Sequence, residues 1–518
     1  MPILARSLSF SVLSGAAIAQ IAVGPSVLDL QRAYHVGTYG AAVDAPSGAV
    51  QLVAQQGTIA FALGGGLTGA LDTWEWDSAG GTFTPNDPLA GTYHVLPRGI
   101  VVLDLDPSNP GTDVVAPYID PAGEVVHIAR YDASPEGLSV LALAKSTGQS
   151  NASLNGTYRF YGQRMELNGA SYQTTSERGT ATFDGLGGVT FAGTELFVAS
   201  SGAATTSSIG GSGPYSVAAD GALLLAGEPG GISSNGELLL KVTGSLTSSE
   251  VGLTIAVRTG SSYDLRNLAG RYHLHGQSHE LGTALGRPNS VTDIGVVTIA
   301  AASANTGTWS IAGQTAESNP LGQTLNPFVA SGAAVLVSNG VVTLTSATGS
   351  FELAFAASGR FAAGRAVLAN ETSLFFLSRA CDENFDYGSA TAGSGGIEPE
   401  LGMRTFPTLG NAGWRFAIVD GRGAAPAILS IGFGRAPAGI PFAGGLLWLD
   451  PARIVASPFV VLGGSAGTAG AGGVDVGLPI PSAVSYDGVK LFSQAFVLDP
   501  LAPAGVAMSR GFEVTFCR

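Results

Sequence analysis

Histidines gather in one short stretch of this chain. His273, His275 and His279 lie within seven positions, Glu280 follows directly, and these three are half of the six histidines in the sequence. On a β-strand, alternation places His273 and His275 on one face, as a His-x-His metal pair requires, and His279 or Glu280 can return from the next turn. The cluster is therefore a candidate metal site. If it held a metal-activated water, the chemistry would be hydrolysis.

An internal comparison gives the cluster a second interpretation. The matching positions of the preceding repeat hold Arg159, Tyr161 and Met165, so the histidines are a local feature of one repeat. The alternative is a set of partly exposed strand histidines, because histidine is intermediate in its preference for burial. We expect no cofactor.

Other chemically suggestive motifs lack the parts that their chemistry needs. Residues 463–467 fit Gly-x-Ser-x-Gly, but a serine triad of that kind needs a later histidine, and the last histidine is His279. The oxygen-bearing residues between 104 and 113 lack the glycine and terminal glutamate of a helix-loop-helix calcium site. Trp74 and Trp76 share a strand face and either line a ligand site or pack in a core. Catalysis is not indicated.

A repeated motif indicates the domains that would position these candidate residues. Leu-x-Gly-x-Tyr occurs at 89–93, 154–158 and 268–272, and a degenerate copy occupies 30–34. From Tyr34 to Tyr158 is 124 positions, and from Tyr158 to Tyr272 is 114. Each interval has the size of a small domain. The copy at 89–93 also allows six half-units, as in propeller blades, but no blade motif is present.

The second repeat, residues 151–265, has the clearest strand pattern. Alternating apolar segments are separated by Asp184-Gly185, Asp220-Gly221 and Asn235-Gly236, which are favoured hairpin turns because these residues tolerate positive φ. The pattern predicts about eight antiparallel strands. A meander of that size closes most naturally into an up-and-down barrel, since closure removes the free edges.

These motifs resemble avidin-like or lipocalin-like barrel modules of secreted bacterial proteins. The resemblance covers about residues 28–380. The third repeat, residues 266–380, keeps the opening motif but lacks the Phe-Asp-Gly element, and the first, residues 28–150, has prolines at 107, 110 and 117 that interrupt its strands. The residues that carry the resemblance are Leu154, Gly156, Tyr158, Thr182 to Gly185, Gly213, Tyr215, Asp220 and Gly221.

The C-terminal quarter has a different pattern. Residues 381–401 are rich in Gly, Ser and Ala and have the composition of a linker. Residues 402–518 resemble a C-terminal β-sandwich module of large secreted proteins of environmental bacteria, which implies a secreted or surface protein without a transferable activity. The motifs that carry this resemblance lie at 407–411, 429–433, 478–481, 494–500 and 513–515.

Composition restricts the partners and suggests the compartment. The net charge of −14 and the absence of a basic cluster argue against nucleic acid as a partner. Arg6, a short apolar stretch and Ala17-Ile18-Ala19 predict a signal peptide at 1–19 and a secreted or cell-surface location. No later segment has about 18 uninterrupted apolar residues, so we expect no membrane span.

The chain has two cysteines, Cys381 and Cys517. In an exported protein we expect them to form a disulfide, because they lie at opposite ends of one candidate domain. On the chain-entropy model such a bridge stabilises by roughly 3–5 kcal/mol. The alternative is a pair of buried free thiols.

Together these features predict an all-β protein. It would have three tandem antiparallel up-and-down barrels of about eight strands each, a linker and a C-terminal β-sandwich. The predicted function is a non-catalytic surface or extracellular protein with a structural, adhesive or binding role and an unidentified extracellular partner. Filled barrel interiors would favour this function, an apolar cavity would favour a small-ligand carrier, and converging His and Glu side chains would favour the hydrolase.

Overall fold

The fold is all-β and divides into two compact units, one made mainly of residues 30–93 and 101–380 and the other mainly of 381–518. The predicted signal peptide lies outside the described residues. The computed structural model describes residues 33–43, 50–62, 66–77, 80–95, 101–104, 114–115, 118–119, 125–131, 136–168, 171–245, 249–260, 263–280, 289–319, 322–338, 340–347, 349–366, 371–380, 385–404 and 407–517.

The first repeat forms a nine-stranded sheet, here called the N-terminal sheet. A third closed barrel is not confirmed, because no pairing of β6 with β7 joins the two ends of the sheet in the described part of the chain. The three strands nearest the predicted proline interruptions, β5, β6 and β7, are only four, two and two residues long. In spatial order the strands are β6 (Val114–Val115), β5 (Val101–Asp104), β4 (Gly80–Val95), β3 (Gly66–Asp77), β2 (Val50–Phe61), β1 (Ala33–Val43), β9 (Glu136–Ala144), β8 (Val125–Tyr131) and β7 (Tyr118–Ile119).

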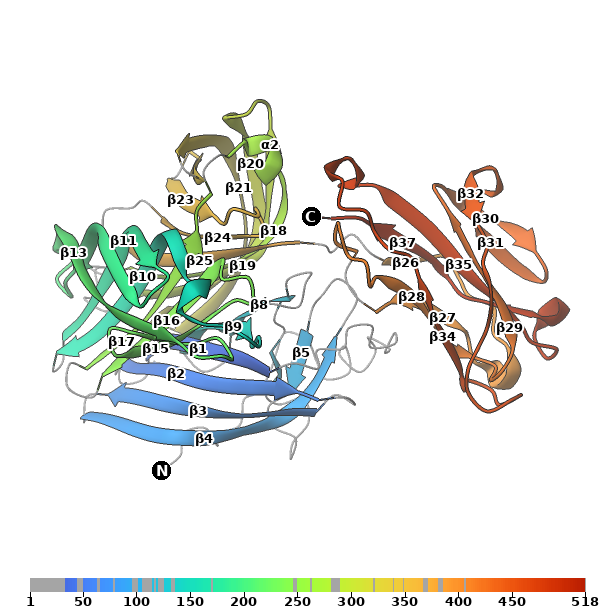
Figure 1. The fold of residues 1–518 in the computed structure, drawn as a ribbon, viewed down its shortest axis with the longest axis horizontal. Helices are drawn as coiled ribbons and strands as arrows, with labels where there is room; N and C mark the ends of the chain where they lie inside the picture. The colour runs from blue at the N-terminus through green and yellow to red at the C-terminus, as the bar shows by residue number, and fades with distance from the viewer. Residues whose placement is uncertain are drawn as a thin grey trace. The chain divides into compact units, whose positions relative to one another are not determined.

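The second repeat forms a closed eight-stranded antiparallel barrel, here called the middle barrel, as its turn pattern predicts. A short 3₁₀ turn, η3 (Asn151–Ser153), precedes it. The strands, several of them labelled in Figure 1, are β10 (Asn155–Asn168), β11 (Ser171–Asp184), β12 (Gly188–Val198), β13 (Ala204–Val217), β14 (Ala222–Leu225), β15 (Glu228–Ile232), β16 (Leu238–Ser245) and β17 (Glu250–Arg258).

The third repeat forms a second closed eight-stranded barrel, here called the last barrel. The short helix α2 (Leu265–Leu268) precedes it. Because both repeats close individually, propeller blades are ruled out for this part of the chain. The strands are β18 (Gly270–Glu280), β19 (Asn289–Ala301), β20 (Thr306–Asn319), β21 (Gly322–Ser338), β22 (Val341–Thr345), β23 (Ser350–Phe355), β24 (Phe361–Ala366) and β25 (Glu371–Arg379).

The Leu-x-Gly-x-Tyr motif marks the start of each closed barrel for a conformational reason. Gly156 and Gly270 have φ values of 112° and 145°, in a region that residues with a side chain rarely adopt. The following tyrosines then turn inward, where Tyr158 Oη donates a hydrogen bond to Gly236 O and Tyr272 Oη donates one to Leu268 O, 2.8 Å away. The copy at 89–93 instead lies within β4 and starts no barrel.

The predicted turns of the middle barrel are present but are longer than two residues. Between β11 and β12, Asp184 Oδ1 accepts hydrogen bonds from the backbone N–H groups of Leu186, Gly187 and Gly188. As in an Asx-type turn, these hydrogen bonds from the backbone to the Asp184 side chain hold the loop of residues 185–187 in place. The turns after β13 and β15 are likewise longer, because β14 begins at Ala222 and β16 at Leu238.

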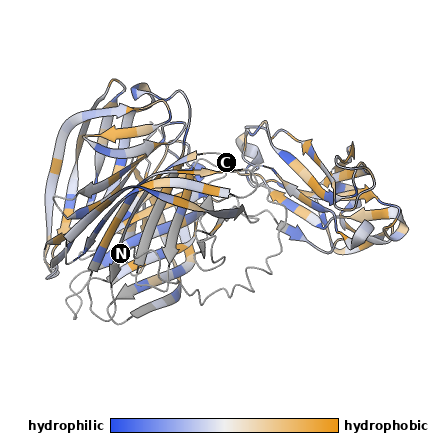
Figure 2. Ribbon diagram, turned by 90° about the horizontal axis from the view of Figure 1, so that it is seen from below, coloured by the Kyte–Doolittle hydropathy of each residue, from blue (hydrophilic) through white to orange (hydrophobic). Residues whose placement is uncertain are grey.

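One face of the N-terminal sheet and the outer faces of both barrels form a common core. Hydrophobic and hydrophilic residues alternate along many strands (Figure 2), and on β17 this places Val251, Leu253 and Ile255 in the common core and Ala256 inside the barrel. The N-terminal sheet and the two barrels therefore form one folded body and are not independent domains joined by linkers. Other members of the common core are Tyr39, Leu52, Leu143, Tyr161, Met165, Phe361 and Phe376.

A hydrogen-bonded chain crosses this core and joins all three sheets. Tyr39 of the N-terminal sheet donates its hydroxyl hydrogen to Gln163 Oε1 of the middle barrel. Gln163 Nε2 in turn donates to the carbonyl oxygen of Thr372 in the last barrel, 2.7 Å away. Tyr39, Gln163 and Thr372 are fully buried, so each contact orients one sheet against another.

The C-terminal unit consists of two packed sheets and a hairpin, as the sandwich resemblance implies. Its large sheet contains β26 (Phe385–Tyr387), β37 (Gly511–Thr515), β35 (Lys490–Leu498), β29 (Pro426–Gly432) and β32 (Ile454–Ala456), with β33 (Phe459–Val461) beside β29 and β36 (Val506–Met508) beside β35. The small sheet contains β27 (Glu400–Met403), β28 (Arg415–Gly421) and β34 (Gly472–Gly477), and the hairpin contains β30 (Arg435–Phe442) and β31 (Gly445–Leu449). The 3₁₀ turns are η4 (Ser394–Gly396), η5 (Pro451–Arg453), η6 (Val484–Tyr486) and η7 (Pro503–Gly505).

Part of the segment predicted as a linker, 381–401, belongs to this unit. β26 pairs with β37, and β27 begins at Glu400 and pairs with β28. The glycine-rich composition thus marks strand connections as well as a boundary between units. Over the described residues, the helices are too short and too polar to span a membrane.

Candidate functional site

β18 presents the predicted metal-binding histidines to the outside of the last barrel. Tyr272 and Leu274 point into the barrel, so the odd-numbered residues of the strand point away from it. His273 and His275 share a face, as their spacing predicts. That face is not exposed, because His273, His275 and His279 are only 3%, 6% and 0% accessible to solvent.

Two of these histidines, His275 and His279, contact other sheets. The ring of His275 stacks on that of His127 from the N-terminal sheet, with centroids 6.3 Å apart. The ring of His279 meets Tyr172 of the middle barrel edge to face at 6.2 Å. His127 Nε2 also lies 2.6 Å from Ser378 Oγ of the last barrel. Each ring therefore takes part in packing between sheets.

Burial keeps these rings neutral. Desolvation lowers the pKa of His275 to about 3 and that of His279 to about 3. It also lowers the pKa of His127 well below its usual value, with the nearby His275 and His273 adding to the effect. His35, which contacts the carbonyl oxygen of Asp220 at 3.1 Å, has its pKa lowered mainly by burial.

The metal site predicted at His273, His275, His279 and Glu280 stays a prediction. Within the described ranges, no three His, Cys, Asp or Glu side chains converge as metal ligands would. The side chain of Glu280 lies outside those ranges, so its participation stays a prediction. A hollow of about 20 Å³ lies beside His127 and His275, which is room for about one water molecule.

The predicted disulfide can be followed only at one end. Cys517 is buried, and its neighbour Thr408 forms an isolated parallel bridge with it. Cys381 lies outside the described residues, so its pairing with Cys517 stays a prediction.

One half of each barrel interior is filled by aromatic and aliphatic side chains. In the middle barrel, Phe183 packs edge to face against both Tyr158 and Tyr215, with each pair of ring centroids 5.1 Å apart. In the last barrel, Phe351 and Phe375 meet at 5.5 Å. Edge-to-face packing of this kind gives a dense core instead of a ligand cavity.

The other half of the middle barrel is charged. Arg164 lies on the same side of β10 as Tyr158, which is the side that lines the barrel. Its guanidinium contacts carboxylates of Glu177 at 2.6 Å, Glu195 at 2.5 Å and Glu250 at 2.6 Å. Burial alone would lower the pKa of Arg164, but the three carboxylates outweigh it and raise that pKa. The chain thus supplies its own cation to an acidic interior.

The last barrel has an acidic interior position for which the described residues provide no such cation. Asp293 pairs in register with Gly276, as Glu177 pairs with Gly162, so the two acids are equivalent. Thr315 Oγ1 donates to Asp293 Oδ1 at 2.7 Å. Burial, with a contribution from Glu317, raises the pKa of Asp293 to about 6 despite this hydrogen bond.

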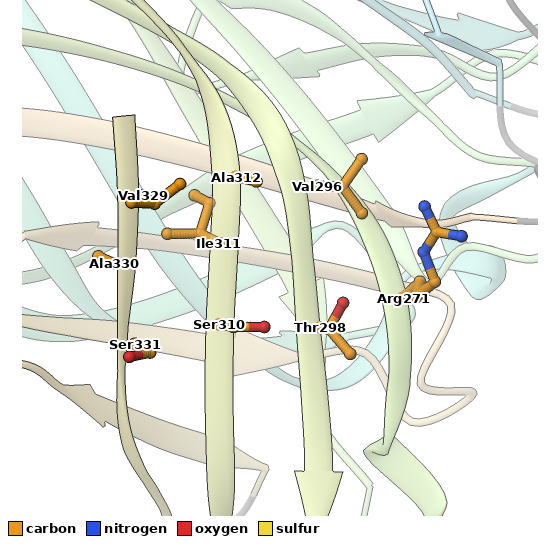
Figure 3. Close-up of a pocket in the computed structure, with 9 residues that line it drawn as sticks. All are labelled: Arg271, Val296, Thr298, Ser310, Ile311, Ala312, Val329, Ala330 and Ser331. Atoms are coloured by element: carbon orange, nitrogen blue, oxygen red, sulfur yellow. The ribbon is translucent and has the colours of Figure 1, made fainter. Parts of the chain in front are cut away.

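An open hollow of about 570 Å³ lies on the outer face of the last barrel. Figure 3 shows two rows across β18 to β21, and the strand register matches them. One row is polar and contains Arg271, Thr298, Ser310 and Ser331, while the other is apolar and contains Val296, Ala312 and Val329. The hollow can offer hydroxyl groups and a guanidinium beside a strip of methyl groups. It has no arrangement of nucleophile and base.

The sequence interpretation did not identify the Arg164 cluster, Asp293 or this hollow. A signal for the first two was present. Gly162-Gln163 and Gly276-Gln277 lie at the same distance from the motif tyrosine of their repeats, so the two repeats align residue by residue. No comparable signal marks the hollow, because Ser, Thr, Ala and Val are ordinary residues on the outer side of a strand.

Comparisons with known proteins add little to this description. No family model matches the chain, and no curated protein matches it. The isotype 1 transferrin binding protein B from serogroup B Neisseria meningitidis is 9% identical, with 67% of this chain and 76% of that chain covered and a TM-score of 0.18. A bacterial polysaccharide outer membrane secretin is 9% identical, with 68% and 99% covered and a TM-score of 0.14. These TM-scores are too low to support an argument.

Proposed function

We propose that this protein acts outside the cell as a non-catalytic binding or structural protein. In this proposal the N-terminal sheet and the two barrels form a rigid scaffold, and partners contact outer surfaces. The observation that carries the proposal is that the chain's own side chains fill the middle barrel and one half of the last barrel.

Two features support a filled scaffold over a small-ligand carrier. Aromatic packing around Phe183 and around Phe375 occupies one half of each barrel. In the middle barrel, the ion pairs of Arg164 occupy the remainder. A carrier of a small apolar molecule would instead need an apolar cavity with a few polar groups.

The outer hollow of the last barrel is the proposed contact surface. Its row of Thr298, Ser310 and Ser331 can donate and accept hydrogen bonds, and Arg271 can add a charge-assisted one. A polar polymer rich in hydroxyl or carboxylate groups would suit such a row. The exposed Val329, 81% accessible, would cover apolar parts of the same partner.

Native mass spectrometry of the exported protein, before and after chelation and reduction, tests the non-catalytic scaffold. We expect the mass of the processed polypeptide with one disulfide and no bound molecule. A retained organic mass would overturn the proposal in favour of a carrier. A stoichiometric metal lost on chelation would overturn it in favour of the histidine site.

Binding of the full chain to an array of polysaccharides tests the contact surface. Ser331→Trp would fill the hollow and is expected to abolish binding. Ser212→Trp is the matched control, because Ser212 pairs with Thr190 in the middle barrel as Ser331 pairs with Ser310 in the last barrel. Equal binding by both variants would show that the hollow is not the contact surface.

A further inference from the structure

The large sheet of the C-terminal unit has one side that its own sandwich does not cover. Ala427 and Leu429 of β29 are buried against the small sheet side, so Ile428 between them faces the other way. On that outer side Ile428 pairs in register with Phe459 of β33 and with Phe496 of β35. Three neighbouring strands thus present large apolar side chains together.

The chain already covers half of this outer side with β-structure. The backbone N–H of Trp448, on the β30–β31 hairpin, donates to Gln494 Oε1 at 2.8 Å, and Gln494 Nε2 donates to Leu446 O at 2.9 Å. At the edge of the covered half, Phe442 packs on Phe496 with ring centroids 5.7 Å apart. This side of the sheet is therefore shaped to pack against another layer of strands.

The uncovered half is a contiguous apolar surface, here called the apolar face. Phe459 is 64% exposed and Leu498 is 50% exposed, although both lie within regular strands. Exposed apolar surfaces of this kind mark interaction sites. The members of the apolar face are Ile428, Phe442, Val455, Phe459, Val461 and Leu498.

Charge indicates what kind of partner fits. The apolar face contains no charged residue, so nothing on it selects a basic or an acidic partner. Residues 385–517 contain seven basic and nine acidic residues, a net charge of −2, whereas the whole chain carries −14. Two copies can approach through this nearly neutral unit with little repulsion.

Size and symmetry agree with a second copy. A large aromatic side chain offers about 150–250 Å² and an aliphatic one less, so two aromatic and four aliphatic side chains that are about half exposed leave roughly 500 Å² uncovered. A stable interface buries about 800 Å² on each partner, with an apolar centre and a polar rim. Ser457, which is exposed and whose hydroxyl oxygen lies 3.1 Å from that of the buried Ser430, supplies part of such a rim. An uncharged sheet face can be complementary to itself about a two-fold axis.

We propose that the apolar face is a dimerisation surface, on which the C-terminal unit of a second copy of this chain packs sheet to sheet about a two-fold axis. This goes beyond the proposed function, which concerns the other unit, and the two can fail separately. Ile428 would lie near the axis and would face its own counterpart.

Light scattering of the full chain after size exclusion, over a wide range of concentrations, measures the association. We expect a dimer that Phe459→Asp converts to a monomer, with a dissociation constant about tenfold higher or more. The matched control is Leu186→Asp, which changes an apolar residue that is 85% exposed in a turn of the middle barrel. A wild-type monomer at every concentration would overturn the proposal, as would a dimer that survives Phe459→Asp.

Two further measurements separate the arrangement from other occupants. Ile428→Cys should give a disulfide-linked dimer under oxidation, and Leu186→Cys should not; absence of the Ile428→Cys dimer would contradict the two-fold packing. Vesicles of phosphatidylcholine are the second probe. Binding that Phe459→Asp abolishes, by a chain that stays monomeric, would assign the face to lipid and overturn the proposed dimer.

Discussion

Arg164 of the middle barrel and Ser278 of the last barrel occupy equivalent positions. Arg164 follows Gly162-Gln163 and Ser278 follows Gly276-Gln277, and the two glycines pair with Glu177 and Asp293 respectively. One barrel therefore compensates its interior acid with a guanidinium, and the other compensates it by keeping the acid protonated to a higher pH.

Arg164→Met should destabilise the protein strongly at neutral pH. The change leaves three carboxylates facing one another without a cation, which costs about 2–4 kcal/mol of unfolding free energy for a partly buried cluster. Urea unfolding at pH 7 measures the loss, and part of it should return as the carboxylates protonate at low pH. Arg266→Met, which breaks an exposed pair with Asp264, is the control and should change little. Equal losses in both variants would contradict the role given to the cluster.

Asp293→Asn should stabilise the protein above pH 6. The native state holds a proton on Asp293 up to a pKa of about 6, whereas the unfolded chain releases it near 3.8, so the wild type loses stability as pH rises between these values. The asparagine oxygen can still accept the hydrogen bond from Thr315. We expect a gain of about 1–3 kcal/mol at pH 8 and none at pH 3. A gain that is the same at both pH values would show that the carboxyl ionisation is not the cause.

Acid should weaken the protein through its buried histidines. The pKa of His279 is lowered to about 3, so from pH 6.5 downward the unfolded chain binds a proton that the native state refuses. Each such histidine contributes a loss of about 1.4 kcal/mol per pH unit in that window. Thermal unfolding between pH 6.5 and 4 measures the slope.

His279→Phe isolates the contribution of that ring. Among the described residues neither ring nitrogen of His279 has a hydrogen-bond partner, so phenylalanine loses no polar contact there and keeps the packing on Tyr172. The variant should keep its stability at neutral pH and show a shallower decline in acid. An unchanged slope would mean that the acid response arises elsewhere.

Gly156→Ala should destabilise the middle barrel through its backbone. A Cβ at this position would meet nothing within 4 Å, so the cost comes from the φ of 112° and not from a clash. We expect a loss of roughly 1–2 kcal/mol. Gly213→Ala, at a glycine of β13 without positive φ and with its nearest neighbour at 3.8 Å, is the control. A similar loss in the control would remove the conformational explanation.

Local sequence signals predicted the closed barrels well. The turns after Asp184, Asp220 and Asn235 and the motif glycines are determined by neighbouring residues, so eight strands of the middle barrel could be placed from the sequence. Closure of the first repeat depends on which distant strands pair at its ends, and strand length near Val114 and Tyr118 decides that. Such long-range pairing has no local signature.

The histidines also show that long-range contacts cannot be predicted from local sequence patterns. Alternation correctly placed His273 and His275 on one side of β18, but it could not tell whether that side meets solvent, the barrel interior or another sheet. Burial depended on Tyr172 and His127, which are about a hundred positions or more away. The Arg164 cluster depends on nearer neighbours, since Glu177 and Glu195 lie on β11 and β12, the two strands on either side of the predicted turn at Asp184.

The common core has an evolutionary consequence. Repeats that touch only through linkers can be gained or lost one at a time, but here the removal of one sheet would uncover Leu253 and Phe376 and leave Gln163 without Tyr39 or Thr372. The stability of each repeat thus depends on its contacts with the other two. Duplication can have supplied the copies, yet after their faces adapted to one another the number of repeats in this body was no longer free to vary.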